Sequence, residues 1–287
     1  MKKIPIRYID TKSKKTDFSG SFNIRNLQNL FTGKDLIQEL HRHDYFYLLA
    51  LKKGSGKHEI DFTPYKVTDH TVYFMRPGQV HQLRLNADST GYMMIFKAGF
   101  YDSHDNKSYQ HLRKASKNNY YQLEAQTFRK LDTALSYIAQ EFANQGEGYQ
   151  DLIKANLKII MIELLRQQDQ HPVHNVTPYT QERLEEFLAL LETHITQHKQ
   201  VAHYADMLHL SPYQLNAITK AALGKTCSEL INEYILLEAK RYLLATSNQV
   251  NQIAFQLGYE DVSYFIRFFK KQTGYSPEVF RHTFKKA

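Results

Sequence analysis

The sequence contains a single cysteine, Cys227, so it cannot form an internal disulfide, and this is typical of a reducing cytoplasm. It also lacks any apolar run close to the about twenty residues that a membrane-spanning helix needs. The first residues, Met1–Arg7, have no apolar core of the kind that a signal peptide requires. From these absences we expect a cytoplasmic protein without a membrane partner.

Positive charge is in excess, and its distribution says more than its total of +8. Residues 1–34 hold eight basic residues against two acidic ones, a net +6, whereas residues 178–287 hold twelve against eleven, a net +1. We therefore predict a solvated basic arm over residues 1–34, with a DNA contact as the alternative. Any contact with DNA in residues 178–287 must depend on where individual side chains are placed, because net charge there is small.

Short β-prone runs separated by glycine and proline turns occupy residues 35–120. The clearest are Tyr45–Leu51, His58–Phe62, Val72–Met75 and Tyr92–Phe96. Runs of this length at this spacing are typical of an all-β barrel or sandwich.

Residues 121–168 change to helical spacing and predict two amphipathic helices. Their apolar positions are Phe128, Leu131, Leu135, Ile138 and Phe142, then Leu152, Ile153, Leu157, Ile160, Met161, Leu164 and Leu165. These faces exceed what a small barrel need cover, so we expect a helical dimerisation element and a homodimer. The polar, proline-containing segment 169–179 is the predicted linker.

Residues 180–287 contain one short pattern twice. Ala205, Leu208 and Leu210 match Ala254, Leu257 and Tyr259 at a shift of 49, and Ser211, Leu215, Lys220 and Gly224 match Asp261, Phe265, Lys270 and Gly274 at a shift of 50. Each copy has an apolar helix, a tight turn, an N-cap residue and a second helix that ends at a glycine. Such a duplication predicts a tandem helix-turn-helix, in which the second helix of each unit lies in a DNA major groove.

A helix over residues 228–245 is predicted between the two units. Leu230, Tyr234, Leu237 and Leu244 lie on one of its faces. At about 1.5 Å per residue it spans roughly 27 Å. This length suits two recognition helices about 34 Å apart, one turn of DNA.

The segment Ile253–Pro277, followed by Phe280 and Arg281, resembles the signature of AraC-family transcriptional regulators, and the resemblance covers residues 180–284. It implies a transcriptional activator that binds double-stranded DNA and contacts RNA polymerase, and not an enzyme. Two arguments predict the DNA-binding residues: the side of the recognition helix on which a residue lies, and the resemblance to the family. The predicted residues are Tyr213, Gln214, Asn216, Ala217, Lys220, Val262, Ser263, Tyr264, Arg267 and Lys270. We further expect Lys220, Lys270, Lys271 and Arg281 to contact phosphates or to be solvated.

Two positions depart from the family's pattern. Ala217 stands where a long polar or basic residue is frequent, and Thr219 replaces a phenylalanine. An alanine offers only a methyl group to a base. Sequence-specific recognition by the first unit is therefore an open question.

The sequences His41-Arg42-His43 and Pro77–His81 resemble the cupin barrel that precedes the DNA-binding domain in many AraC-family regulators. The resemblance implies a small-molecule effector, such as a sugar or another anionic or polar metabolite, in the barrel mouth. The candidate effector-binding residues are Arg42, His43, Tyr45, Tyr47, His81 and Arg84. Metal-binding cupins carry a glutamate soon after the His-x-His pair, and none follows here, so we expect hydrogen-bonded barrel histidines with no metal or cofactor.

The expected fold class is α+β: a cupin-like barrel over residues 35–120, a two-helix element over 121–168 and an all-α tandem helix-turn-helix domain over 180–287. Two alternatives stay open: a regulator without any ligand, and a metal-dependent cupin enzyme, against which the missing glutamate counts. A fused DNA-repair methyltransferase is excluded, because its nucleophilic cysteine would lie outside the DNA-binding region and Cys227 lies inside it.

Overall fold

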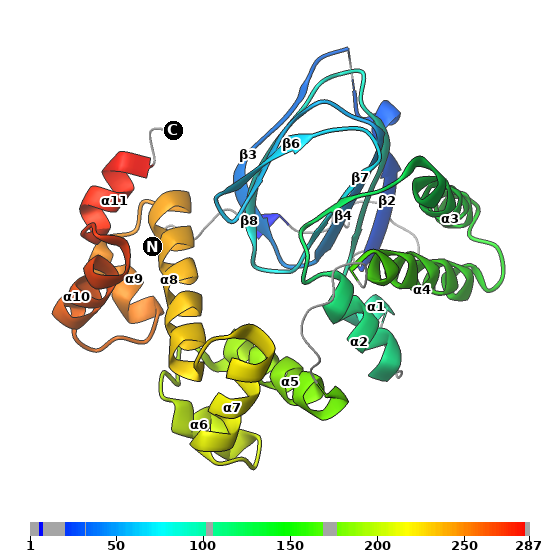
Figure 1. Ribbon diagram of the computed structural model, residues 1–287. Coiled ribbons are helices and arrows are strands. Elements are labelled where there is room, and N and C mark those ends of the chain that lie inside the picture. Colours follow the sequence, from blue (N-terminus) through cyan, green and yellow to red (C-terminus); the bar gives the residue numbers. More distant parts are fainter. Residues whose placement is uncertain (1–5, 8–20, 32, 102–105, 169–176, 285–287) are drawn as a thin grey trace. The chain divides into compact units, whose positions relative to one another are not determined.

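The computed structural model describes residues 6–7, 21–31, 33–101, 106–168 and 177–284 (Figure 1). The chain divides into two compact units, one over Pro5–Gln170 and the other over His171–Ala287. Each unit is described by itself below. Among the described residues, no helix combines the length and the apolar character that crossing a membrane requires.

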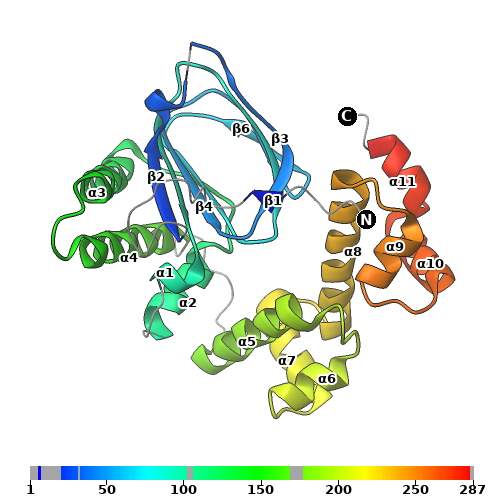
Figure 2. The ribbon, with the colours of Figure 1, turned by 180° about the vertical axis from the view of Figure 1, so that it is seen from behind.

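The first unit is a β-barrel made of two five-stranded sheets (Figures 1 and 2). One sheet has the order β1-β3-β8-β5-β6 and the other has the order β10-β7-β4-β9-β2. The strands are β1 Ile6–Arg7, β2 Phe22–Asn26, β3 Leu36–His43, β4 Phe46–Lys53, β5 Gly56–Ile60, β6 Thr63–Val67, β7 Thr71–Met75, β8 Val80–Leu85, β9 Thr90–Phe96 and β10 Tyr120–Gln122. The predicted cupin-like all-β architecture is confirmed.

Strand β4 shows how the barrel is covered on both faces. Its alternate residues Tyr47 and Leu49 join the core inside the barrel, while Leu48 and Ala50 join a second core outside the sheet. Successive side chains of a strand point to opposite faces, so a strand with two buried faces is apolar throughout. This explains why the sequence of β4 shows no alternation between polar and apolar residues.

Helices cover the outer face of the β10-β7-β4-β9-β2 sheet (Figure 2). These are α1 Ala98–Tyr101, α2 Asn106–Ala115, α3 Ala125–Asn144 and α4 Tyr149–Gln168. The two long helices, α3 and α4, are the ones that the helical spacing predicts. Helices α1 and α2 lie inside the segment predicted to be barrel, where the sequence pattern predicts no helix.

The prediction of a solvated arm over residues 1–34 is wrong for its last part. Strand β2 pairs with β9, and its residues Phe22 and Ile24 are buried in the outer core. A short 3-10 helix, η1 Leu27–Asn29, follows and buries Leu27. The net charge of a 34-residue segment does not reveal a strand of only five residues within it. Most of the basic residues of the segment lie outside the described residues.

The argument for a dimerisation element also needs correction. Phe128, Leu135, Ile153 and Leu157 are all buried, and they belong to the same core as the outward side chains of the sheet. Most of the apolar positions singled out in the sequence therefore cover this chain's own barrel, whereas Leu152 is exposed. The outer face of this sheet is apolar and must be buried under helices. The prediction assumed that a small barrel needs less cover than this.

The second unit is all helical and has one continuous core. Its helices are α5 Pro178–His194, α6 Val201–Met207, α7 Pro212–Leu223, α8 Cys227–Ala245, α9 Val250–Gln256, α10 Val262–Thr273 and α11 Pro277–Phe284. Helices α6 and α7 form the first predicted helix-turn-helix, and α9 and α10 form the second. Both predictions are confirmed.

Helix α8 is the predicted spacer between the two helix-turn-helix motifs, and it has 19 residues. At about 1.5 Å per residue its length is roughly 28 Å. Its fully buried face contains Leu230, Ile231, Ile235 and Ala239, whereas Tyr234 and Leu244 are only partly buried. The buried face is thus rotated by part of a turn from the predicted one.

Candidate nucleic-acid interface and effector site

The two recognition helices begin and end where the sequence predicts. Ser211 is the N-cap of α7: its hydroxyl accepts from the Gln214 amide N–H at 3.2 Å, and the Gln214 side chain accepts from the Ser211 N–H at 2.8 Å. This reciprocal pair is a capping box. Asp261 caps α10 by accepting from the Ser263 N–H at 2.7 Å. The helices end at Gly224 and Gly274, which both have the left-handed backbone conformation.

The turns inside the two units have the same geometry. In the first turn the Leu210 N–H donates to the Ala205 carbonyl at 2.9 Å, and in the second the Tyr259 N–H donates to the Ala254 carbonyl at 2.9 Å. His209, with φ 54°, and Gly258, with φ 72°, occupy equivalent positions. The second turn has one residue more before its N-cap, which accounts for the change of shift in the repeat.

Each recognition helix presents one exposed face. On α7, Tyr213 is 83% exposed, and Ala217 and Lys220 are exposed on the same side, four and seven residues further on. On α10 the exposed residues are Ser263, Tyr264, Arg267 and Lys270. The opposite faces carry Leu215 and Phe265, both fully buried in the helical core. These exposed faces are where a major groove could be contacted.

Two residues predicted to contact DNA also form hydrogen bonds within the protein. Gln214 forms the capping box of α7. Asn216 donates through Nδ2 to the Pro212 carbonyl at 3.0 Å and accepts through Oδ1 from the Cys227 N–H at 2.9 Å, which joins α7 to the start of α8. A bidentate contact with adenine would use the same two atoms. Both residues thus make capping contacts in the structure, and their contact with DNA stays a prediction.

Val262 is also less available than predicted, because it is half-buried against the helical core. Thr219, which departs from the family's pattern, is buried; its hydroxyl donates to the Asn216 carbonyl at 3.1 Å and lies 3.5 Å from Cys227 Sγ. Thr219, Asn216 and Cys227 thus connect α7 to α8 by polar contacts. Burial raises the pKa of the Cys227 thiol, so this cysteine is not an activated nucleophile.

Arg267 is the most prominent side chain of the α10 face. It is 68% exposed and lies 3.7 Å from the Asp261 carboxylate. An exposed ion pair at this distance stabilises the protein by less than about 1 kcal/mol, so the guanidinium can turn toward another acceptor. The equivalent residue of the first helix-turn-helix is Ala217, 50 positions earlier in the sequence.

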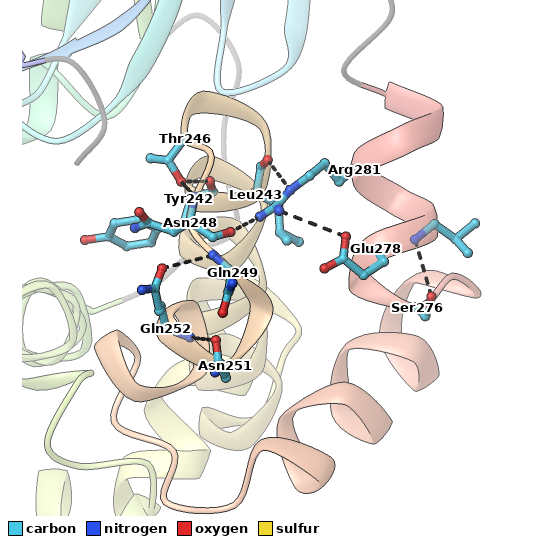
Figure 3. A network of polar contacts seen from close by, with 11 residues as sticks. Tyr242, Leu243, Thr246, Asn248, Gln249, Asn251, Gln252, Ser276, Glu278 and Arg281 are labelled. Carbon is cyan, nitrogen blue, oxygen red and sulfur yellow. Dashed lines mark hydrogen bonds and ion pairs between the residues drawn. The ribbon is translucent and has the colours of Figure 1, made fainter. Parts of the chain in front are cut away.

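Arg281 has partners inside the protein, so the alternative that it is a solvated charge is wrong. Its side chain is 13% exposed and faces Glu278 at 4.0 Å. Nε donates to the Leu243 carbonyl at 3.1 Å, and Nη2 donates to the Asn248 carbonyl at 2.5 Å (Figure 3). Arg281 thereby ties α11 to the C-terminal end of α8 and to the loop before α9. The sequence contains no signal for these partners, because they lie 38 and 33 residues away.

Replacing Arg281 with methionine is expected to lower the free energy of unfolding by roughly 2–4 kcal/mol. The variant leaves two buried carbonyl groups without the charged donor, and such losses cost this much in other proteins. Urea unfolding of the full chain, followed by circular dichroism, measures the change. Arg267→Met is the matched control, since that arginine is exposed, and it should shift the free energy by less than about 0.5 kcal/mol. Equal effects of the two substitutions would contradict the assigned role.

Four buried histidines lie together inside the barrel. His41 and His43 come from β3, His81 from β8 and His58 from β5. Strand pairing explains the cluster, because His41 lies opposite His81 on β8, and β5 pairs with the other edge of β8. The closest nitrogen pairs are His43 Nε2 to His81 Nε2 at 2.7 Å, His58 Nε2 to His81 Nδ1 at 2.9 Å and His81 Nε2 to His41 Nε2 at 3.1 Å. His81 is thus at the centre of a set of close contacts between ring nitrogens.

Burial, with the nearby His41 as the second cause, lowers the pKa of His58 to about 3. This ring is neutral at physiological pH. The tyrosines predicted at the effector site lie beside the cluster: the ring centroids of Tyr45 and Tyr47 are 4.5 and 5.3 Å from that of His43. Both tyrosines are buried.

The two arginines predicted for the effector site lie elsewhere. Arg84 has a side chain that is 63% exposed and pairs with Asp35 at 3.2 Å. Arg42 stands between His41 and His43 on β3, so the pleat places its side chain on the opposite face of the sheet. The structure places His41 and His58 in contact with His81. His58 could have been predicted, because it shares its strand face with the apolar Ile60.

Known families match both units. The model described as "AraC-like ligand binding domain" matches residues 34–127, and the model described as "Helix-turn-helix domain" matches residues 204–283. The chain belongs to the AraC family. As an AraC-family protein with both domains, it is a DNA-binding transcriptional regulator with an effector-binding domain.

Curated relatives of this AraC-family chain extend over most of its length. The HTH-type transcriptional activator RhaS of Escherichia fergusonii is 24% identical over 249 residues, which cover 84% of this chain and 86% of the relative. RhaS of Escherichia coli K12 is 26% identical over 247 residues, with the same coverage. By their names, both relatives are transcriptional activators.

Among solved structures, fatty-acid-bound ToxT from Vibrio cholerae is 17% identical and aligns over 91% of this chain and 95% of its own, with a TM-score of 0.41. That similarity is too distant to bear on the details of either unit.

Proposed function

We propose that this AraC-family regulator activates transcription by placing α7 and α10 in successive major grooves on one side of DNA, under the control of an effector bound inside the barrel. The observation that carries the proposal is the pair of equivalent exposed helix faces on either side of the spacer α8. Activation would also need a contact between the bound regulator and RNA polymerase.

The residues on these faces suggest how DNA would be recognised. The Arg267 guanidinium can donate to O6 and N7 of one guanine, which is the commonest specific contact in the major groove. Lys220 and Lys270 lie at equivalent positions later in each helix and suit phosphate oxygens, which position a protein without specifying sequence. Tyr213 and Tyr264 offer large exposed surfaces for contacts with base edges.

Selection of bound fragments from the source genome by the purified full chain tests this function. We expect enriched sites with two short blocks about 10 base pairs apart, one helical turn. The double variant Arg267→Ala, Lys270→Ala should lose the second block and keep the first. No enrichment, with or without a panel of metabolites, or sites with a single block, would contradict the tandem arrangement.

We propose the interior of the barrel beside His43, Tyr45, Tyr47 and His81 as the effector site. Here two imidazoles and two tyrosine rings lie together inside the barrel, and such a set of polar aromatic groups can orient a small polar molecule. Thermal unfolding with sugars and small anions tests the proposal: a ligand at one hundred times its Kd should stabilise the protein by about 2.7 kcal/mol. Tyr47→Phe should reduce the effect. A panel without any stabilising compound would favour the alternative of a regulator that binds no ligand.

We also propose that a second copy of the chain pairs along α4. Leu152 is 38% exposed and Ile159 is 48% exposed, and they lie seven residues apart with the exposed Ala155 between them. An apolar stripe at this spacing is typical of helices that pair.

The double variant Leu152→Glu, Ile159→Glu is therefore expected to be monomeric at micromolar concentration, where the wild-type chain is a dimer. Sedimentation equilibrium measures both states. Thr133→Glu, Gln140→Glu on α3 is the matched control with the same spacing, and it should stay dimeric. A wild-type chain that sediments as a monomer would remove the dimer from the proposed mechanism.

A further inference from the structure

Three buried histidines bring one ring nitrogen each to a common point inside the barrel. His81 Nε2 lies 2.7 Å from His43 Nε2 and 3.1 Å from His41 Nε2, and the three ligand atoms all lie within 4.8 Å of one another. We propose that His41, His43 and His81 bind one divalent transition-metal ion. The proposal concerns the same barrel interior as the proposed effector site.

The separations of the nitrogens suit an ion. Imidazole nitrogens bind such ions at about 2.0–2.1 Å, so two neighbouring ligands of one ion are about 3.0–3.4 Å apart. The two short separations, 2.7 and 3.1 Å, differ from this range by a few tenths of an ångström at most. The remaining pair, at no more than 4.8 Å, can approach by rotation of the two rings.

The hydrogen bonds behind the rings direct lone pairs toward the same point. His41 Nδ1 lies 2.5 Å from the Glu39 carbonyl oxygen. A carbonyl only accepts, so Nδ1 carries the proton and the lone pair of the neutral ring is on Nε2. His81 Nδ1 lies 2.9 Å from His58 Nε2, and donation to His58 leaves the His81 lone pair on Nε2 as well. Metal-binding histidines are usually oriented by such a second hydrogen bond.

The chemistry of the set indicates the class of ion. Three imidazoles suit zinc, iron(II), cobalt or nickel, whereas magnesium and calcium prefer oxygen ligands. The three ligands are neutral, so the bound ion keeps its positive charge and has open positions. Metal-binding cupins supply a glutamate as a further ligand, and this chain does not. The position of that ligand is therefore open to an anionic oxygen donor from another molecule. This last step rests on the proposed effector function, and the binding of the ion does not.

Cobalt(II) is the probe for the first test. We expect the full chain, freed of metal with a chelator, to bind one Co²⁺ per chain with visible absorption bands, and Zn²⁺ to displace it. His43→Gln and His81→Gln should abolish the bands, and His58→Phe should weaken binding by about 10–100-fold. His198→Gln is the control, because His198 stacks on His203 in the helical unit and should leave binding unchanged. A wild-type chain that binds no Co²⁺ or Zn²⁺, or ligand variants that bind as the wild type does, would overturn the proposal.

A second measurement needs no variant and covers the case in which the substitutions prevent folding. X-ray absorption of the zinc-loaded wild-type chain should show three imidazole nitrogens around the ion, and fewer would overturn the assignment. Both tests are made without an effector. If the ion binds and no metabolite stabilises the protein, the effector function fails while the metal site stands. If metabolites bind equally well to the metal-free chain, the ion is not part of the effector site.

Discussion

Replacing Gly258 with alanine is expected to destabilise the second helix-turn-helix by more than about 3 kcal/mol, the largest effect on stability that we predict. Gly258 has φ 72°, and a Cβ atom at this position would lie 1.7 Å from the Thr196 carbonyl oxygen and 2.8 Å from Lys199 Nζ. The Lys199 ammonium donates to the Gly258 carbonyl at 2.8 Å. The backbone at this turn is thus in direct contact with the segment between α5 and α6, which leaves no room for a side chain.

This contact connects the turn between α9 and α10 to the segment between α5 and α6. We therefore expect it to affect DNA binding as well as stability. Together with α8 it holds the two recognition helices at one spacing. Gly258→Ala should therefore weaken binding to sites with two blocks more than binding to either block alone. Urea unfolding and DNA titration of the full chain measure the two effects.

The equivalent residue of the first turn provides the matched control. His209 has φ 54° in the same position, and a residue with a Cβ is strained there. His209→Gly is expected to leave stability unchanged or to raise it by up to about 1 kcal/mol. The opposite signs at two equivalent positions are the critical result. A Gly258→Ala variant within about 1 kcal/mol of the wild type would show that the close contact with Thr196 relaxes easily.

Replacing Arg267 with alanine is expected to weaken binding to the selected DNA site by about 1–3 kcal/mol, which is roughly 5–150-fold. The substitution removes both donors to a guanine and leaves the helix intact, because Arg267 is exposed and its ion pair with Asp261 is long. Arg267→Lys keeps the charge but not the bidentate geometry, so it should bind with relaxed discrimination at that base pair. Fluorescence anisotropy at one fixed salt concentration measures the affinities, since salt alone changes them strongly.

The first unit offers the converse experiment. Ala217 occupies the position equivalent to Arg267. Ala217→Arg should strengthen binding where the first block has a guanine within reach. Arg183 lies on α5 and is ion-paired, so Arg183→Ala is the control and should leave the affinity for DNA unchanged. Equal losses of affinity for Arg267→Ala and Arg183→Ala would mean that Arg267 contributes only general electrostatics.

The helical unit was largely predictable, because its signals are local. An N-cap, a turn and a terminal glycine act within one or two helical turns, and Ser211, Asp261, Gly224 and Gly274 occupy these positions in the structure as predicted. Duplication of the pattern then established the tandem arrangement. The strands of the barrel were predictable for the same reason, from short apolar runs between turns.

Side-chain roles were less predictable, because their partners are distant in sequence. Asn216 was assigned to the groove from its helical position, and only the fold brings the Cys227 N–H to its side chain. Arg281 resembles a solvated charge until α8 and α11 pack together. A position on a helix predicts which way a residue points, whereas a hydrogen-bond partner depends on the neighbouring element.

The barrel shows the same division between local and tertiary information. Alternation along β3 puts His41 and His43 on one face whatever the fold, but only the pairing of β3, β8 and β5 brings His81 and His58 to the same place. The sequence by itself determined the two-unit architecture, the tandem helix-turn-helix and the family. The tertiary structure decided which polar side chains of the recognition helices are exposed, which hold helices together and which converge inside the barrel, because burial and strand register are properties of the folded chain.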